Sequence, residues 1–94
     1  MKLSDLNKKQ ETLRKKFLKR GVKMIAPETI FFSKDTIIGK NVTIDPYVVI
    51  GEKVKIKNNV KIFSFSHLVN TSIDSNVTVG PYARLRPGTK LLSG

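Results

Sequence analysis

The chain has 94 residues, no cysteine and a formal net charge of +11. Its length allows one small domain, and the lack of cysteine excludes disulfides and thiolate metal sites. A chain without cysteine suits a reducing cytoplasm. No apolar run approaches the roughly 20 residues of a membrane span, and the charged N-terminus does not resemble a secretory signal. We therefore predict a cytoplasmic domain without membrane insertion.

The positive charge is unevenly distributed. Residues 1–23 contain nine lysines and arginines and two acidic residues, whereas residues 24–94 contain nine and five. A basic chain can bind nucleic acid, but no recognised nucleic-acid motif is present, and the aromatic residues fit the repeat described below. A basic helix lying on a membrane surface is a further alternative, but the apolar face is thin. We expect neither nucleic acid nor membrane as a partner.

Apolar residues at helical spacing predict a helix over about residues 5–20. Ser4 is a suitable N-cap, Asp5 places a negative charge in the first turn, and Gly21 suits the position after the last turn. The apolar stripe consists of Leu3, Leu6, Leu13, Phe17 and Leu18, with Gln10 in its remaining position. Because the stripe is narrow, we expect the helix to pack along one surface. Residues 1–23 are accordingly assigned to a helical linker arm.

An 18-residue repeat begins near Thr36 and continues through the rest of the chain. The aligned positions are Ile38/Ile56/Ile73, Asn41/Asn59/Asn76, Val42/Val60/Val77, Ile44/Ile62/Val79, Tyr47/Phe65/Tyr82 and Ile50/Leu68/Leu85. Within each repeat the aliphatic residues recur every six positions, with one slip near Val69–Asn70 that we interpret as a local change at a corner. Such regularity predicts a solenoid.

The repeat has the composition of short strands separated by turns. Apolar residues alternate with polar ones, Val and Ile favour strands, and Gly, Asn and Pro lie between the stretches. Three strands and three corners per repeat form a triangular coil whose strands stack in parallel. The three asparagines and the three aromatic residues should each form a column. We predict a parallel β-helix of about 3.5 coils over residues 24–94; a β-sandwich would not keep so many hexads in phase.

The segment GPYARLRPG at residues 80–88 carries a more specific resemblance. Together with GVKMIAPET at residues 21–29 and the hexads, it closely resembles the bacterial bifunctional N-acetylglucosamine-1-phosphate uridylyltransferase/glucosamine-1-phosphate acetyltransferase family. The match is to the end of the linker helix and the first coils of the acetyltransferase domain. Hexads alone are common to many acyltransferases.

The resemblance implies a left-handed parallel β-helix, although parallel crossovers are otherwise almost always right-handed. It also implies a homotrimer with acetyl-coenzyme A bound between neighbouring helices, and glucosamine-1-phosphate as the acceptor. The product would be N-acetylglucosamine-1-phosphate, on the way to UDP-N-acetylglucosamine for peptidoglycan of the cell wall and for lipopolysaccharide.

One binding residue is carried over from the resemblance. Arg86 matches the family arginine that contacts the sugar phosphate, and a guanidinium presents a rigid fork to phosphate oxygens. The alternative is a solvated strand residue. Arg84 is left unassigned. On the resemblance, the catalytic histidine and the uridylyltransferase half fall outside these 94 residues, so we assign no catalytic, cofactor-binding or metal residue and expect no activity from the chain alone.

His67 is the only histidine and shares its repeat position with Val49 and Arg84. We interpret it as a surface or corner residue. The β-helical carbonic anhydrases, the main rival enzymes on this fold, need three histidines around zinc.

Two functions remain open. The first is an incomplete part of the bifunctional enzyme, and the second is a non-enzymatic trimerisation or interaction module, or the remnant of a decayed gene. Residues 91–94 stop within a coil without a polar capping turn, which would expose strand edges. We expect a stable independent module to be capped, so this feature favours the first function.

Overall fold

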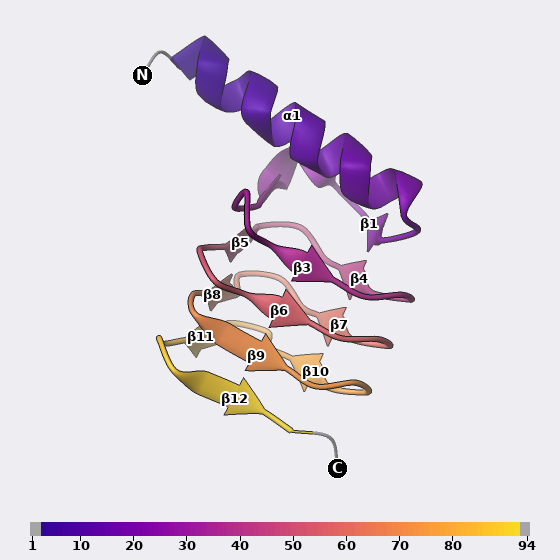
Figure 1. Ribbon diagram of the computed structural model, residues 1–94, viewed down its shortest axis with the longest axis vertical. Coiled ribbons are helices and arrows are strands. Elements are labelled where there is room, and N and C mark those ends of the chain that lie inside the picture. The colour runs from indigo at the N-terminus through magenta and orange to yellow at the C-terminus, as the bar shows by residue number, and fades with distance from the viewer. Residues whose placement is uncertain (1–2, 93–94) are drawn as a thin grey trace.

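A computed structural model describes residues 3–92, with side chains described from residue 7. This part of the chain forms one helix, α1 (Leu3–Lys19), and twelve short strands (Figure 1). A 3-10 turn at Pro27–Thr29 lies between the first two strands. The strands are β1 (Lys23–Met24), β2 (Ile30–Phe31), β3 (Ile37–Ile38), β4 (Thr43–Ile44), β5 (Val48–Ile50), β6 (Lys55–Ile56), β7 (Lys61–Ile62), β8 (His67–Leu68), β9 (Thr71–Ile73), β10 (Thr78–Val79), β11 (Arg84–Leu85) and β12 (Thr89–Leu91).

The strands form the three sides of a triangular coil. Every third strand joins the same parallel sheet, in the orders β1-β4-β7-β10, β2-β5-β8-β11 and β3-β6-β9-β12. The predicted parallel β-helix is confirmed. It has four turns rather than about 3.5. The difference arises in the first turn, β1–β3, which begins before the regular repeat and has few residues at hexad spacing.

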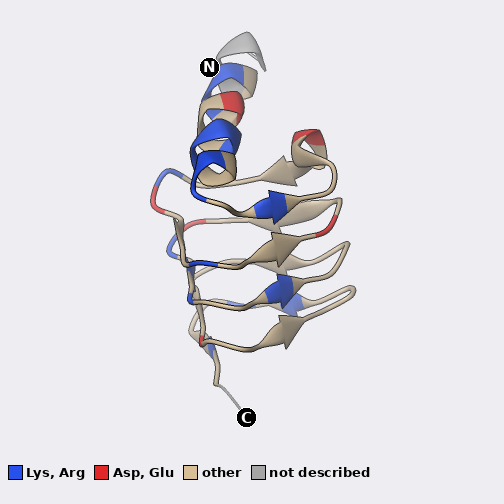
Figure 2. Cartoon of the chain, turned by 90° about the vertical axis from the view of Figure 1, so that its right-hand side faces the viewer, with Lys and Arg blue, Asp and Glu red and all other residues tan. Residues whose placement is uncertain are grey.

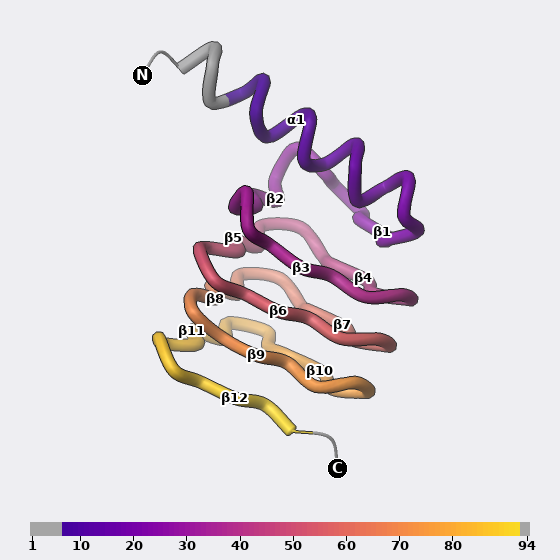
Figure 3. The backbone as a smooth tube through the Cα atoms, viewed as in Figure 1, coloured from indigo at the N-terminus to yellow at the C-terminus, as the bar shows by residue number. Residues whose placement is uncertain are grey.

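The coil is left-handed. In Figure 1 the chain runs rightward along β3 on the near side, returns along β4 and β5 on the far side, and arrives at β6 one level lower. The backbone trace in Figure 3 follows the same path at each level. This handedness agrees with the expectation.

The core is the aliphatic ladder that the repeat predicts. Its buried members in the strands and corners include Ile30, Ile38, Val42, Ile44, Val48, Ile50, Val54, Ile56, Val60, Ile62, Leu68, Ile73 and Val79. Alternate residues along each strand point inward, so each turn contributes side chains to one continuous apolar interior. The last turn, β10–β12, is less enclosed than the others, as the partial burial of Leu85 and Leu91 shows.

The two predicted side-chain columns are present at separate corners. The rings of Tyr47 and Phe65 stack with centroids 5.4 Å apart, and Phe65 stacks on Tyr82 at 5.2 Å. In the other column, Asn41 Nδ2 donates to Asn59 Oδ1 at 2.8 Å. All members of both columns have φ between 56° and 64°. That left-handed conformation suits asparagine but is unusual for aromatic residues.

The predicted slip is confined to one corner. Leu68 and Thr71 are one residue closer in sequence than Ile50 and Val54, which they match one turn higher. Pairing is retained on both sides, with Ile50 opposite Leu68 and Ile56 opposite Ile73. The interpretation of a local corner variation is confirmed.

Helix α1 lies across the N-terminal end of the coil (Figures 1 and 3). Phe17 is fully buried, and its ring lies 4.7 Å from that of Phe32. Leu18, which we placed in the apolar stripe, is 44% exposed and lies outside this contact. The helix begins two residues before the predicted start. The predicted roles of the Ser4 and Asp5 side chains lie outside the described side chains.

Candidate functional site

The candidate site lies on the outer face of the sheet β2-β5-β8-β11. In this sheet Arg84 of β11 pairs with His67 of β8, and Val49 of β5 pairs with His67. All three side chains are exposed, while Leu68, the next residue of β8, is fully buried. The predicted equivalence of Val49, His67 and Arg84 is confirmed, and His67 is a surface residue as expected.

Arg86 follows β11 and shares the outer face with Arg84, because alternate residues of an extended chain point to the same side. Its backbone is fixed by a turn, in which the Thr89 N–H and hydroxyl donate to the Arg86 carbonyl at 3.1 and 2.6 Å. The Gly88 N–H donates to Asn70 O at 2.8 Å and joins this turn to the level above. The backbone position of Arg86 is thus set by this turn and by its link to the level above.

A shallow depression connects these side chains. It is lined by His67, Val69, Arg84, Leu85, Arg86 and Pro87. Val69 and Leu85 are the two aliphatic residues of its lining, and both are half-buried. The structure therefore brings both arginines of the ARLRPG segment into one concavity with the only histidine.

The depression is positively charged and has no acidic residue in its lining. Neither arginine forms an ion pair with any residue whose side chain the structure describes. Two neighbouring guanidinium groups repel each other and attract an anion, and each can donate two parallel hydrogen bonds to phosphate or carboxylate oxygens. The arrangement can bind an anion without displacing an ion-pair partner from residues 7–92.

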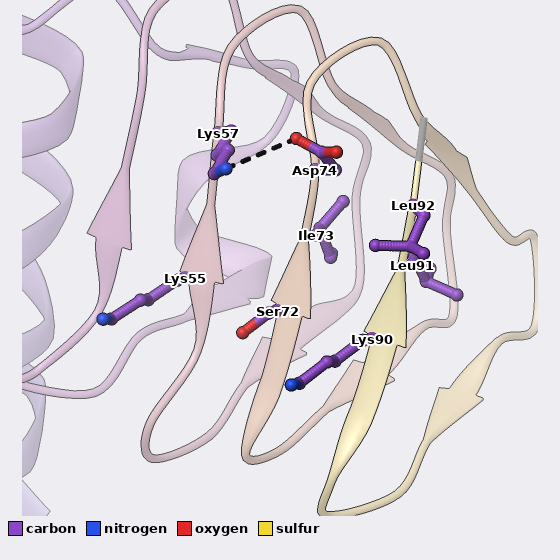
Figure 4. Close-up of a pocket in the computed structure, with 8 residues that line it drawn as sticks. All are labelled: Lys55, Lys57, Ser72, Ile73, Asp74, Lys90, Leu91 and Leu92. Carbon is purple, nitrogen blue, oxygen red and sulfur yellow. Dashed lines mark ion pairs between the residues drawn. The ribbon is translucent and has the colours of Figure 1, made fainter. Parts of the chain in front are cut away.

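A second depression lies on the sheet β3-β6-β9-β12. It is lined by Lys55, Lys57, Ser72, Ile73, Asp74, Lys90, Leu91 and Leu92 (Figure 4). Lys55, Ser72 and Lys90 extend to the same side from three adjacent strands, and Lys57 Nζ lies 3.5 Å from Asp74 Oδ1. Sequence reasoning did not single out these residues. The three exposed side chains occupy one register column, but lysines and serines on solvated strands give no specific signal.

Other basic residues lie along α1, and Figure 2 shows them together with lysines on the strands. Within residues 3–92, no helix is both long and apolar enough to cross a membrane. Nor does this part of the chain contain a cluster of three His, Asp or Glu side chains suited to a metal ion.

Both the repeat and the amino-acid sequence are similar to those of known proteins. Residues 35–69 match the family described as bacterial transferase hexapeptide (six repeats). A protein from Zymomonas mobilis named bifunctional protein GlmU is 49% identical over 82 residues, covering 87% of this chain and 18% of that relative. The same-named proteins of Azorhizobium caulinodans and Wolbachia pipientis wMel are 45% identical over 85 residues and 50% over 82. These alignments cover 90% and 87% of this chain, and 19% of each relative.

The chain is homologous to one segment of the bifunctional GlmU proteins. It spans less than a fifth of the length of these relatives. The predicted family resemblance is confirmed at this level, and the hexapeptide match accords with the left-handed coil seen in Figure 1. The depression spans the third and fourth turns: His67 and Val69 lie within the residues matched by the hexapeptide family, whereas Arg84 and Arg86 lie outside them.

Proposed function

We propose that this chain supplies the linker helix and the first turns of the acetyltransferase β-helix of a GlmU-type enzyme, with Arg86 binding the phosphate of glucosamine-1-phosphate. The observation that carries the proposal is the position of Arg86 in a basic depression on the outer face of a hexapeptide coil, where no described side chain forms an ion pair with it. A phosphate monoester carries nearly two negative charges at neutral pH, which suits an arginine that has no ion-pair partner among the described side chains.

The complete enzyme would transfer an acetyl group from acetyl-coenzyme A to the amine of glucosamine-1-phosphate. It would also make UDP-N-acetylglucosamine from the product, in the cytoplasm. We propose that the β-helix acts as a homotrimer and that acetyl-coenzyme A binds between neighbouring helices. We assign no residue of this chain to acetyl-coenzyme A, because the family resemblance matches none of these 94 residues to its site.

We further propose that these 94 residues do not acetylate by themselves. Amine acetylation needs a general base within hydrogen-bond reach of the proton it removes. The family resemblance matches no residue here to the catalytic histidine, and His67 occupies a strand position that is valine one turn above. Purified chain incubated with acetyl-coenzyme A and glucosamine-1-phosphate should release no free thiol above the rate without protein; turnover would overturn this proposal.

The binding role of Arg86 is tested by titrating the isotope-labelled chain with glucosamine-1-phosphate and following amide chemical shifts. The chemical-shift changes should concentrate around residues 67–69 and 84–88. The affinity for glucosamine-1-phosphate should be about tenfold lower in Arg86→Gln. Lys55→Gln is the control, since it removes one exposed positive charge from a different sheet. Equal affinities in Arg86→Gln and Lys55→Gln would remove Arg86 from the site.

A non-enzymatic trimerisation or interaction module is the second candidate. It is favoured by the exposed apolar residues Phe31 and Val49 beside the exposed column of Tyr47, Phe65 and Tyr82. Sedimentation equilibrium of the purified chain tests this candidate. A trimer without affinity for glucosamine-1-phosphate would favour the module, whereas binding that depends on Arg86 would favour the enzyme segment.

A further inference from the structure

We propose that Arg84 is a second phosphate-binding residue, which together with Arg86 selects a phosphate monoester over a singly charged anion. This inference rests on the proposed binding of glucosamine-1-phosphate and extends it to a residue that the family resemblance leaves unassigned. The phosphate would lie between the two guanidinium groups, beside the half-buried Val69.

The backbone geometry places the two arginines at a suitable spacing. They are separated by one residue on an extended segment, so their Cα atoms lie about 7 Å apart and their side chains leave the same face. Leu85 between them points toward the interior and is half-buried, which keeps the strand in this orientation. Two long side chains rooted at this distance can converge on one phosphate group from opposite sides.

The hydrogen bonding of β11 anchors Arg84 independently of any ligand. Its neighbour Ala83 accepts a hydrogen bond from the His67 N–H at 2.7 Å, and Leu85 accepts one from the Val69 N–H at 3.3 Å. Arg84 itself is held in register opposite His67. The backbone is therefore fixed, while the guanidinium remains exposed and free of a carboxylate partner among the described side chains.

The charge of the ligand follows from the charge of the site. One guanidinium neutralises a singly charged anion, and a second one nearby then remains uncompensated in a depression whose lining contains no acidic residue. A monoester dianion compensates both, and its three terminal oxygens can accept a fork from each arginine. His67, adjacent to Arg84, adds a third nitrogen donor at the upper rim.

The test compares Arg84→Gln with the wild-type chain in titrations monitored by amide chemical shifts, using glucosamine-1-phosphate, methyl phosphate and dimethyl phosphate. We expect Arg84→Gln to weaken glucosamine-1-phosphate about tenfold, the change typical of losing a hydrogen bond between charged groups. The wild-type chain should prefer methyl phosphate over the singly charged dimethyl phosphate, and Arg84→Gln should lose most of this preference. Arg84→Lys, which keeps the charge without the fork, should fall between the two.

Lys55→Gln again serves as the matched loss of one positive charge, and thermal unfolding of each variant establishes that the fold is retained. If Arg84→Gln behaves like Lys55→Gln while Arg86→Gln weakens binding, Arg84 is not a ligand-binding residue and the proposed role of Arg86 stands. If neither arginine variant differs from Lys55→Gln, or the wild-type chain binds none of the three probes, both proposals are wrong. Weaker binding of both phosphate esters by the same factor would contradict the selection of the dianion.

Discussion

Gln10 of α1 and Phe32, which follows β2, exchange two hydrogen bonds. Gln10 Nε2 donates to the Phe32 carbonyl at 2.8 Å, and the Phe32 N–H donates to Gln10 Oε1 at 2.8 Å. The side-chain amide of Gln10 thereby makes the two hydrogen bonds with the Phe32 backbone that a neighbouring strand would otherwise make. Arg14 extends the contact, because its Nε donates to Ile30 O at 2.9 Å and its guanidinium lies 5.1 Å from the centre of the Phe31 ring. The helix closes an open strand edge of the first turn as well as covering its apolar end.

Replacing Gln10 should therefore destabilise the fold. Gln10→Ala leaves the N–H and C=O of the buried Phe32 without these partners, and we expect a loss of about 1–3 kcal/mol in the free energy of unfolding. Gln10→Glu keeps the acceptor for the Phe32 N–H but sets a carboxylate oxygen against the Phe32 carbonyl oxygen, so it should also destabilise the fold. Urea denaturation measures both, with the exposed Lys9→Ala as control; an effect of Gln10→Ala no larger than that of Lys9→Ala would contradict this account.

The burial of Phe17 predicts that the helix is an integral part of the fold. Phe17→Ala should cost about 3–5 kcal/mol, because it removes a fully buried ring that packs on Phe32. Phe17→Leu retains most of the apolar volume and should cost less, so it remains measurable if the alanine variant does not fold. Leu18→Ala, at a 44% exposed neighbour, is the control. Equal effects at the two positions would show that α1 does not depend on this contact.

The aromatic column should contribute to the stability of the middle turns. Phe65 stacks on both Tyr47 and Tyr82, so Phe65→Ala removes two ring contacts, and we expect a loss of about 1–3 kcal/mol. Tyr82→Ala removes one described ring contact and should cost about half as much. Both positions have φ near 60°, so the backbone conformation is matched between the variants. Chemical denaturation decides: a larger loss for Tyr82→Ala would argue against a column that acts through stacking.

Asp35 should make the stability depend on pH at the acid end. The Ser33 hydroxyl, and then the Lys53 N–H, hydrogen-bond the Asp35 carboxylate and lower its pKa below the ordinary value. A carboxyl group whose pKa is lower in the folded state stabilises the fold above its unfolded pKa, near 4, and loses that contribution as pH falls through its folded pKa. The unfolding temperature of Asp35→Asn should lie below that of the wild type at pH 7, and the gap should close as pH falls below about 4. A gap that does not change with pH would contradict this assignment.

Much of the coil follows from the sequence alone. The ladder from Ile38 to Leu68 and the alignment of Tyr47 with Phe65 predicted a parallel solenoid and its columns, and the structure confirms both. This succeeded because a strand repeat fixes side-chain direction with period two, and each turn can bury its apolar residues only against the next turn. The same alignment predicted that His67 lies level with Arg84, and the two residues pair in the sheet. The binding role of Arg86 rests on the family resemblance and remains a proposal.

The tertiary structure decided where the elements meet. The helical stripe indicated a packing surface, but only the fold directs Phe17 and Gln10 onto the first turn, where Phe32 presents both a ring and free backbone groups. The first turn lacks the regular hexads, so its strands depend on pairing with β4 and β5. Likewise, ARLRPG marks two arginines, but the depression beside them also needs β8, which lies 17 residues earlier. Local pattern determines the period and the faces of each strand, whereas contacts between distant segments depend on how the whole chain closes.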